Sequence, residues 1–102
     1  MSASTPNLEE FLGGYFHQDW PEDAPTAVAI VERYLNEWPI EEVPKALSEL
    51  NLLLAQSDDD LMRCVVGMGC FYNPAADSMS YREWLNRVAD RLNSFLREQS
   101  IS

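Results

Sequence analysis

Basic residues are scarce in this chain of 102 residues, which holds 7 Lys and Arg against 17 Asp and Glu and carries a formal net charge of −10. A protein this negative repels phosphate groups, so the charge argues against a nucleic-acid backbone and against an anionic membrane. A basic partner would be attracted instead. The charge therefore predicts partners that include no nucleic acid and no membrane.

Residues suited to metal binding and catalysis are also few. His17 is the single histidine, and Cys64 and Cys70 are the two cysteines, which together are too few for a zinc site. The sequence has no G-x-S-x-G, no H-E-x-x-H and no glycine-rich phosphate-binding pattern. We therefore expect no metal, no other cofactor and no enzyme activity. A hydrolase that uses His17 with a nearby acid is the alternative.

Long apolar segments are missing too. The first ten residues, MSASTPNLEE, contain neither the basic nor the apolar part of a secretion signal. Nowhere do 18 apolar residues follow one another, as a membrane span would need. The sequence therefore predicts a cytoplasmic protein whose two cysteines are reduced, and burial in the core is the simplest role for each.

Apolar residues make up 46% of the chain and recur at helical spacing. They supply enough surface to offset the chain entropy of one folded domain. We expect residues 1–102 to form a single helical domain with an ordered core over about 7–98. Because strand alternation and hairpin signals are absent, the predicted class is all-α, a small bundle of about five amphipathic helices.

Capping patterns set the expected start of the first helix. Asn7 followed by Glu10 has the form of a capping box and predicts a helix over 8–17. Within this helix the paired Gly13 and Gly14 weaken helix formation and are typical of a close approach by another element.

A loop over 17–24 is expected to lead into a second helix over 25–37. Pro25 suits the first turn of this helix, with Asp23 or Ala24 near its cap. Its predicted inward residues are Val28, Val31, Tyr34, Leu35 and Trp38.

Two further helices follow in the middle of the chain. The third takes Pro39 or Pro44 in its first turn and ends near Ala55. Ser57, with Asp60 three residues later, caps a fourth helix that Gly67 and Gly69 end.

The last helix has the clearest start signal. After an expected loop over 71–80, Ser80 and Glu83 form a capping box, and apolar spacing continues to about residue 98. The opposite face of this helix carries four arginines, Arg82, Arg87, Arg91 and Arg97.

Acidic residues are concentrated in the first three-fifths of the chain. Residues 1–60 hold 13 acids and 2 bases, for a net −11, whereas residues 61–102 hold 4 acids and 5 arginines, for a net +1. Ends of adjacent helices gather in a bundle, so these acids are candidates for one negative surface that binds a basic protein. A solvated face with ordinary helix-end charges is the alternative. The candidate residues for this partner-binding acidic surface are Asp19, Glu22, Asp23, Glu37, Glu41 and Glu42.

A block of aromatic and polar residues, YFHQDW, occupies 15–20. Its aromatics are candidates for anchoring a partner, because aromatic residues are enriched at interface hot spots. The simpler interpretation is that Phe16 and Trp20 fill the core while His17 and Asp19 fasten the loop by hydrogen bonds.

This block and a second one, GCFYNPAADSMSYREWL at 69–85, resemble the CdiI immunity family of bacterial contact-dependent growth inhibition systems. The resemblance covers most of residues 8–96. It implies that the chain binds the toxic C-terminal domain of a delivered effector, frequently a nuclease, and neutralises it in the cytosol. The motif residues, which are expected to hold the scaffold, are Tyr15, Phe16, His17, Gln18, Trp20, Tyr72, Tyr81 and Trp84.

The resemblance implies no catalytic residue and identifies no toxin contact. Since immunity proteins are specific to their toxins, variable surface residues are expected to carry that specificity. A different class of function remains the alternative, a non-catalytic adaptor in a larger complex that uses the arginines of the last helix.

Overall fold

Helices are the main elements of the structure. The computed structural model describes residues 6–23 and 25–101, with side chains for all of these except Asp23, Ser100 and Ile101. Its elements in chain order are α1 (Pro6–Tyr15), α2 (Trp20–Asp23), α3 (Ala27–Glu37), the 3-10 helix η1 (Ile40–Glu42), α4 (Val43–Leu54), α5 (Asp58–Gly67), the 3-10 helix η2 (Pro74–Asp77) and α6 (Tyr81–Ile101). Among the described residues there is no strand, and five helices have ten or more residues, which confirms the predicted all-α class.

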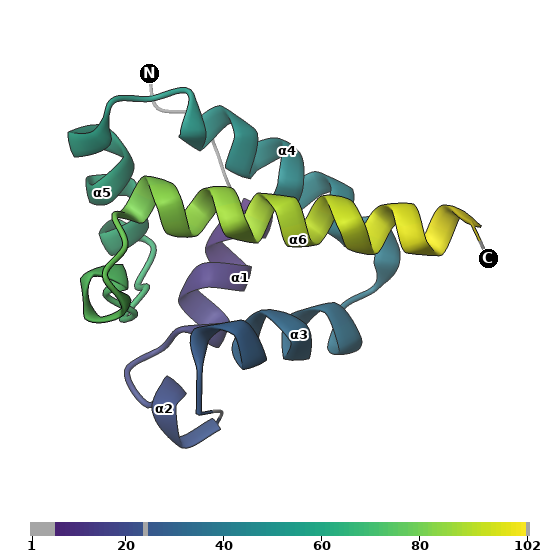
Figure 1. Cartoon of the computed structure of the whole chain (residues 1–102), viewed down its shortest axis with the longest axis horizontal. Helices are drawn as coiled ribbons and strands as arrows, with labels where there is room; N and C mark the ends of the chain where they lie inside the picture. Colours follow the sequence, from purple (N-terminus) through teal and green to yellow (C-terminus); the bar gives the residue numbers. More distant parts are fainter. Residues whose placement is uncertain (1–5, 24, 102) are drawn as a thin grey trace.

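The longest helix, α6, organises the bundle. It runs across the molecule with α4 above it and α3 below it, while α1 crosses behind (Figure 1). Apolar faces of these helices meet in one core, where the Phe11 ring of α1 stacks on the Tyr34 ring of α3 at a centroid distance of 3.9 Å. The apolar spacing predicted for the last helix matches its burial, because Trp84, Leu85, Val88 and Leu92 are buried. No helix in the described part of the chain is both long and apolar enough to cross a membrane.

The predicted cap of the first helix is wrong. Asn7 lies inside α1, which begins at Pro6, and its side-chain Nδ2 donates to Glu49 Oε2 at 2.7 Å. Glu49 Oε1 accepts from the backbone N–H groups of Asn7 and Leu8 at 3.0 and 3.1 Å. The cap therefore comes from α4, 42 residues away, because a carboxylate satisfies free N–H groups at the positive end of a helix.

The predicted start of the second helix is also wrong, by two residues. Thr26 is the cap of α3, and its hydroxyl accepts from the Ala29 N–H at 3.1 Å. Val28 is 71% exposed although its spacing predicted burial, since Ala27, Ile30 and Val31 occupy the core-facing positions.

Most remaining boundaries agree with the sequence. Pro44 lies in the first turn of α4, preceded by η1, and Ser57 caps α5 by accepting from the Asp60 N–H at 3.3 Å. The Ser80 and Glu83 capping box forms in both directions, at 3.1 and 3.3 Å. The two predicted loops are shorter than expected because each contains a short helix, α2 and η2 respectively.

The expected close approach at the paired glycines occurs at one of them. A Cβ at Gly13 would lie 2.2 Å from the Met68 carbonyl oxygen, whereas a Cβ at Gly14 would meet nothing within 4 Å. Gly69, at φ +87°, turns the chain after α5 in a conformation that favours glycine. Thus α1 rests directly on the backbone that ends α5.

Candidate functional site

The two sequence blocks meet in the fold. Phe16, from the first block, is fully buried. Its ring centroid lies 5.7 Å from that of Tyr72 and 5.2 Å from that of Trp84, both in the second block. Half-buried Trp20 packs edge-on against Phe16 and Tyr72. A backbone hydrogen bond of 2.7 Å from Phe71 N–H to the Phe16 carbonyl joins the blocks further. These aromatics therefore fasten the turn after α1 to α6.

Polar residues of the first block hold the same turn. The Tyr15 hydroxyl donates to Glu37 Oε1 at 2.8 Å, and burial followed by this bond raises the pKa of Tyr15 to about 12. His17 Nδ1 accepts from the Asp19 backbone N–H at 3.1 Å. Gln18 is exposed in the turn. Tyr15, His17 and Glu37 share one shallow hollow between α1 and α3, so the structure brings these three predicted residues together.

Polar contacts also order the second block. The Tyr72 hydroxyl donates to Asp77 Oδ2 at 2.5 Å, and burial together with this bond raises the pKa of Tyr72 well above its usual range. Burial likewise raises the pKa of the half-buried Tyr81 hydroxyl. Cys70 lies buried beside this segment, where burial raises the pKa of its thiol to about 11. A thiol held protonated in this way is unsuited to nucleophilic chemistry.

The candidate acids do not all lie at one end of the bundle. Asp19 and Glu22 are on the segment that enters α3, and Glu41 and Glu42 are on the 3-10 helix that leaves it (Figure 1). Helix α3 has 11 residues and is therefore about 16 Å long. Glu37 is in its last turn. The side chain of Asp23 falls outside the described part of the structure.

These acids also differ in the hydrogen bonds and ion pairs that they make within the protein. Glu37 pairs with Arg33 at 3.0 Å besides binding Tyr15, and Glu42 pairs with Lys45 at 3.3 Å. Asp19, Glu22 and Glu41 are exposed. These three side chains make no hydrogen bond or ion pair with any described residue, so they are the candidates most available to a partner.

Comparison with known proteins decides the family. The sequence profile of the CdiI immunity protein family matches residues 4–92, which span both blocks and most of the bundle. The chain belongs to the CdiI immunity protein family. Searches of curated proteins and of solved structures give no match. The family is the one that the blocks at 15–20 and 69–85 resemble, so the chain is an immunity protein of contact-dependent growth inhibition.

Two of the four arginines on α6 are used inside this immunity protein. Arg82 Nε lies 2.6 Å from Asp58 Oδ1, and its other nitrogens donate to the carbonyl oxygens of Leu54 and Gln56. Arg91 forms a two-point pair with Glu32 at 2.6 and 2.8 Å. Arg82 therefore joins α6 to the turn between α4 and α5, while Arg91 joins it to α3. An adaptor surface built on all four arginines would have to break these contacts.

Sequence reasoning missed one feature of the immunity protein, an open groove between α3, η2 and α6 with a volume of about 340 Å³. Exposed Val28 and exposed Arg87 both line it. The apolar spacing of the sequence did single out Val28, but it predicted that this side chain would be buried in the core. Within the described residues no group of three or more His, Cys, Asp or Glu side chains is placed to hold a metal ion.

Proposed function

We propose that this immunity protein acts in the cytosol as a stoichiometric inhibitor, which binds the toxic domain of its cognate effector and neutralises it. The family match over residues 4–92 is the observation that carries this proposal. In the proposed mechanism the chain carries out no catalysis and needs no cofactor. It works by covering the toxin's active site or substrate channel.

The charge of the chain supports a basic toxin. A net charge of −10 attracts a positively charged partner over distances comparable to the Debye length, about 8 Å at physiological salt. A nuclease must bind phosphates and therefore presents a basic cleft. The proposed target is accordingly a nuclease domain, and the immunity protein itself binds neither nucleic acid nor membrane.

The proposed contact surface consists of the six candidate acids, Asp19, Glu22, Asp23, Glu37, Glu41 and Glu42. Carboxylates on a contact surface mainly accelerate encounter with a basic partner and contribute less to the lifetime of the complex. Asp19, Glu22 and Glu41 are the best test of this role, because their side chains make no hydrogen bond or ion pair with any described residue that a substitution would remove.

The test uses the toxic C-terminal domain of the cognate effector. We expect the triple variant Asp19→Asn, Glu22→Gln, Glu41→Gln to associate about tenfold more slowly at low salt, with a weaker dependence of the rate on salt. Stopped-flow association measured over a series of salt concentrations provides the check. The matched control neutralises three exposed acids elsewhere, Glu10→Gln, Asp59→Asn and Asp90→Asn. Equal slowing in both triple variants would contradict a localised acidic surface, and an unchanged rate would contradict electrostatic attraction by these residues.

A further inference from the structure

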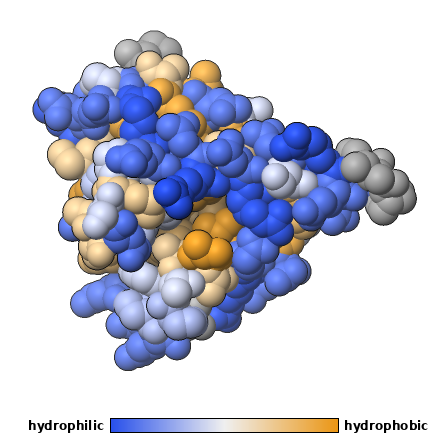
Figure 2. Space-filling model, in the orientation of Figure 1, coloured by the Kyte–Doolittle hydropathy of each residue, from blue (hydrophilic) through white to orange (hydrophobic). Residues whose placement is uncertain are grey.

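The groove between α3, η2 and α6 is lined mainly by apolar side chains. Figure 2 shows apolar surface between α6 and α3, next to the hydrophilic surface of α6. The apolar side chains that line the groove are Ala27, Val28, Val31, Met79, Trp84 and Val88. Its volume of about 340 Å³ falls in the range of sites that take a side chain or small ligand.

Val28 lies at the open mouth of the groove and is not part of the packed core. It lies in the first turn of α3 and is 71% exposed, while Val31 and Val88 at the floor are buried. An apolar side chain left in water at the mouth of a hollow gains free energy when a partner covers it, at about 25 cal/mol per Å² of apolar area. The groove is therefore suited to receive an apolar side chain from outside.

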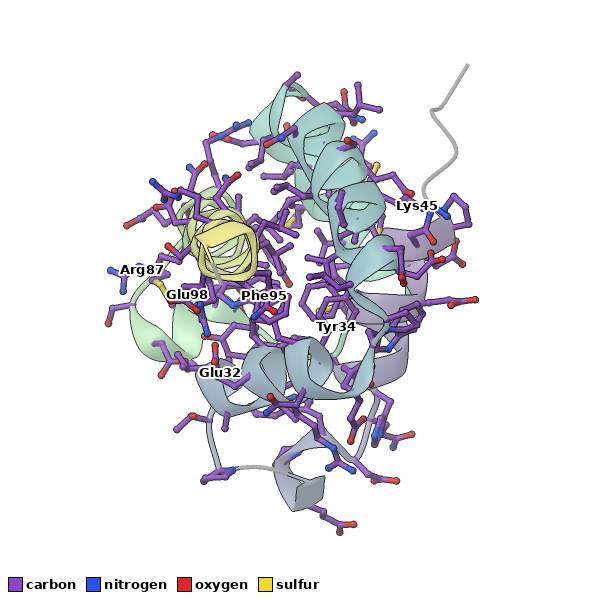
Figure 3. The ribbon with its side chains drawn as sticks, turned by 90° about the vertical axis from the view of Figure 1, so that its right-hand side faces the viewer. Glu32, Tyr34, Lys45, Arg87, Phe95 and Glu98 are labelled. Atoms are coloured by element: carbon purple, nitrogen blue, oxygen red, sulfur yellow. The ribbon has the colours of Figure 1, made fainter. Side chains whose placement is uncertain are left out.

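Three of the four charged residues that line the groove are already engaged within the chain. Glu32 and Arg91 form the two-point ion pair, and Asp77 accepts from the Tyr72 hydroxyl. Arg87 is exposed and makes no hydrogen bond or ion pair with any described residue. Figure 3 shows Glu32 pointing from α3 toward α6, and Arg87 pointing outward from α6 on the same side of the molecule.

The four charges sum to zero, since Glu32 and Asp77 balance Arg87 and Arg91. The groove thus differs from the molecule as a whole, which carries −10. Glu32 and Asp77 already have hydrogen-bond partners within the chain, whereas the Arg87 guanidinium has none among the described residues. The partner group that suits the edge of the groove is therefore a carboxylate, which can pair with Arg87. Arginine pairs with a carboxylate through two parallel N–H donors, which fixes the orientation of the partner.

We propose that this groove is the docking site for an apolar side chain of the toxin domain, held beside a toxin carboxylate that pairs with Arg87. The inference rests on the proposed function and adds the position of the contact. The six candidate acids accelerate encounter with a basic toxin, and the groove then retains it. A central apolar anchor next to an arginine pair is the kind of contact that dominates interface free energy and slows dissociation.

The binding of two groove variants to the same toxin domain tests the proposal. Val28→Arg fills the mouth of the groove with charge, and Arg87→Glu reverses the rim. Both positions are exposed, so both variants are expected to fold, which circular dichroism verifies. Each should weaken binding about tenfold or more, chiefly through faster dissociation. The matched controls, Leu52→Arg on α4 and Arg97→Glu near the end of α6, make the same changes at exposed positions outside the groove lining and should alter affinity less than about threefold.

The outcomes separate this inference from the function on which it rests. If Val28→Arg and Arg87→Glu both bound the toxin domain as tightly as the wild type, the groove would not be the docking site, and the proposed immunity function would be unaffected. A loss in Leu52→Arg alone would place the contact on α4 and also overturn the groove. Failure of the wild-type chain to bind would overturn both proposals. As a test of the arginine pair, a lysine substitution at one acidic residue of the toxin should restore binding to Arg87→Glu, and failure of every such substitution would contradict the pair.

Discussion

Gly13 is the glycine at which an added Cβ would meet the closest atom. A methyl group at this position would lie 2.2 Å from the Met68 carbonyl oxygen, a backbone atom that cannot move aside cheaply. We expect Gly13→Ala to lower the free energy of unfolding by about 1–3 kcal/mol, as overpacking does. Urea unfolding followed by circular dichroism measures it.

Gly14→Ala is the matched control, because nothing lies within 4 Å of a Cβ there. Alanine favours helix over glycine by up to about 1 kcal/mol, so this variant should unfold at equal or higher urea concentration. If both variants lost the same stability, the direct contact of α1 with the end of α5 would not be what requires glycine.

Single residues also show where local patterns mislead. The 3.6-residue period placed Val28 on the same inward stripe as Val31 and Tyr34, yet Val28 is exposed. The stripe is about 100° wide, and which edge of it faces the core depends on how α3 packs against α6. That packing is a property of two distant segments, so the sequence of α3 alone does not contain it.

At the scale of elements, Glu49 stabilises α1 from outside that helix. Its carboxylate receives both the Asn7 and Leu8 backbone N–H groups and the Asn7 side chain. Glu49→Ala leaves these donors without their acceptor and should cost about 1–2 kcal/mol, the range of lost helix caps. Thermal or urea unfolding measures this cost. Glu10→Ala, an exposed glutamate in α1, serves as the control, and an equal loss in that variant would argue against a capping role.

The Glu32 and Arg91 pair joins α3 to α6 and makes stability depend on pH. The hydrogen bonds from Arg91 lower the pKa of Glu32 below its ordinary value of 4.5. The unfolded chain therefore binds this proton more readily, so the pair contributes its full stability above about pH 4.5 and loses it as pH falls below that value.

Urea unfolding of wild type and Glu32→Gln between about pH 7 and pH 3 tests this linkage. We expect the wild type to be more stable near neutral pH, with the difference shrinking as pH falls. A difference that stayed constant across this range would contradict the linkage.

Most elements were predictable because their signals are local. Ser57 with Asp60 and Ser80 with Glu83 are caps that lie within four residues of the helices they begin, and both predictions are confirmed. The start of α1 was missed because its cap, Glu49, lies 42 residues from Asn7. Short helices such as α2 were not predicted, because four residues are too few to show the helical period of apolar residues.

At the scale of the whole molecule, the candidate surfaces were predictable to different degrees. The −11 and +1 division of charge is a count, so the sequence suffices for it. The groove requires Val28, Asp77 and Arg87 to line one hollow, and these residues come from three separate elements. Their proximity depends on the packing of α3 and η2 against α6. The acids remain the proposed attracting surface, and the groove is the proposed anchor.

The central claim is that this immunity protein neutralises a toxin domain by binding it one to one. The most direct measurement adds increasing amounts of the immunity protein to a fixed amount of the toxin domain and follows cleavage of its nucleic-acid substrate. We predict a linear fall of toxin activity that reaches zero at one molar equivalent. Full activity in molar excess would contradict inhibition by binding, and complete loss at a small fraction of an equivalent would indicate a catalyst instead.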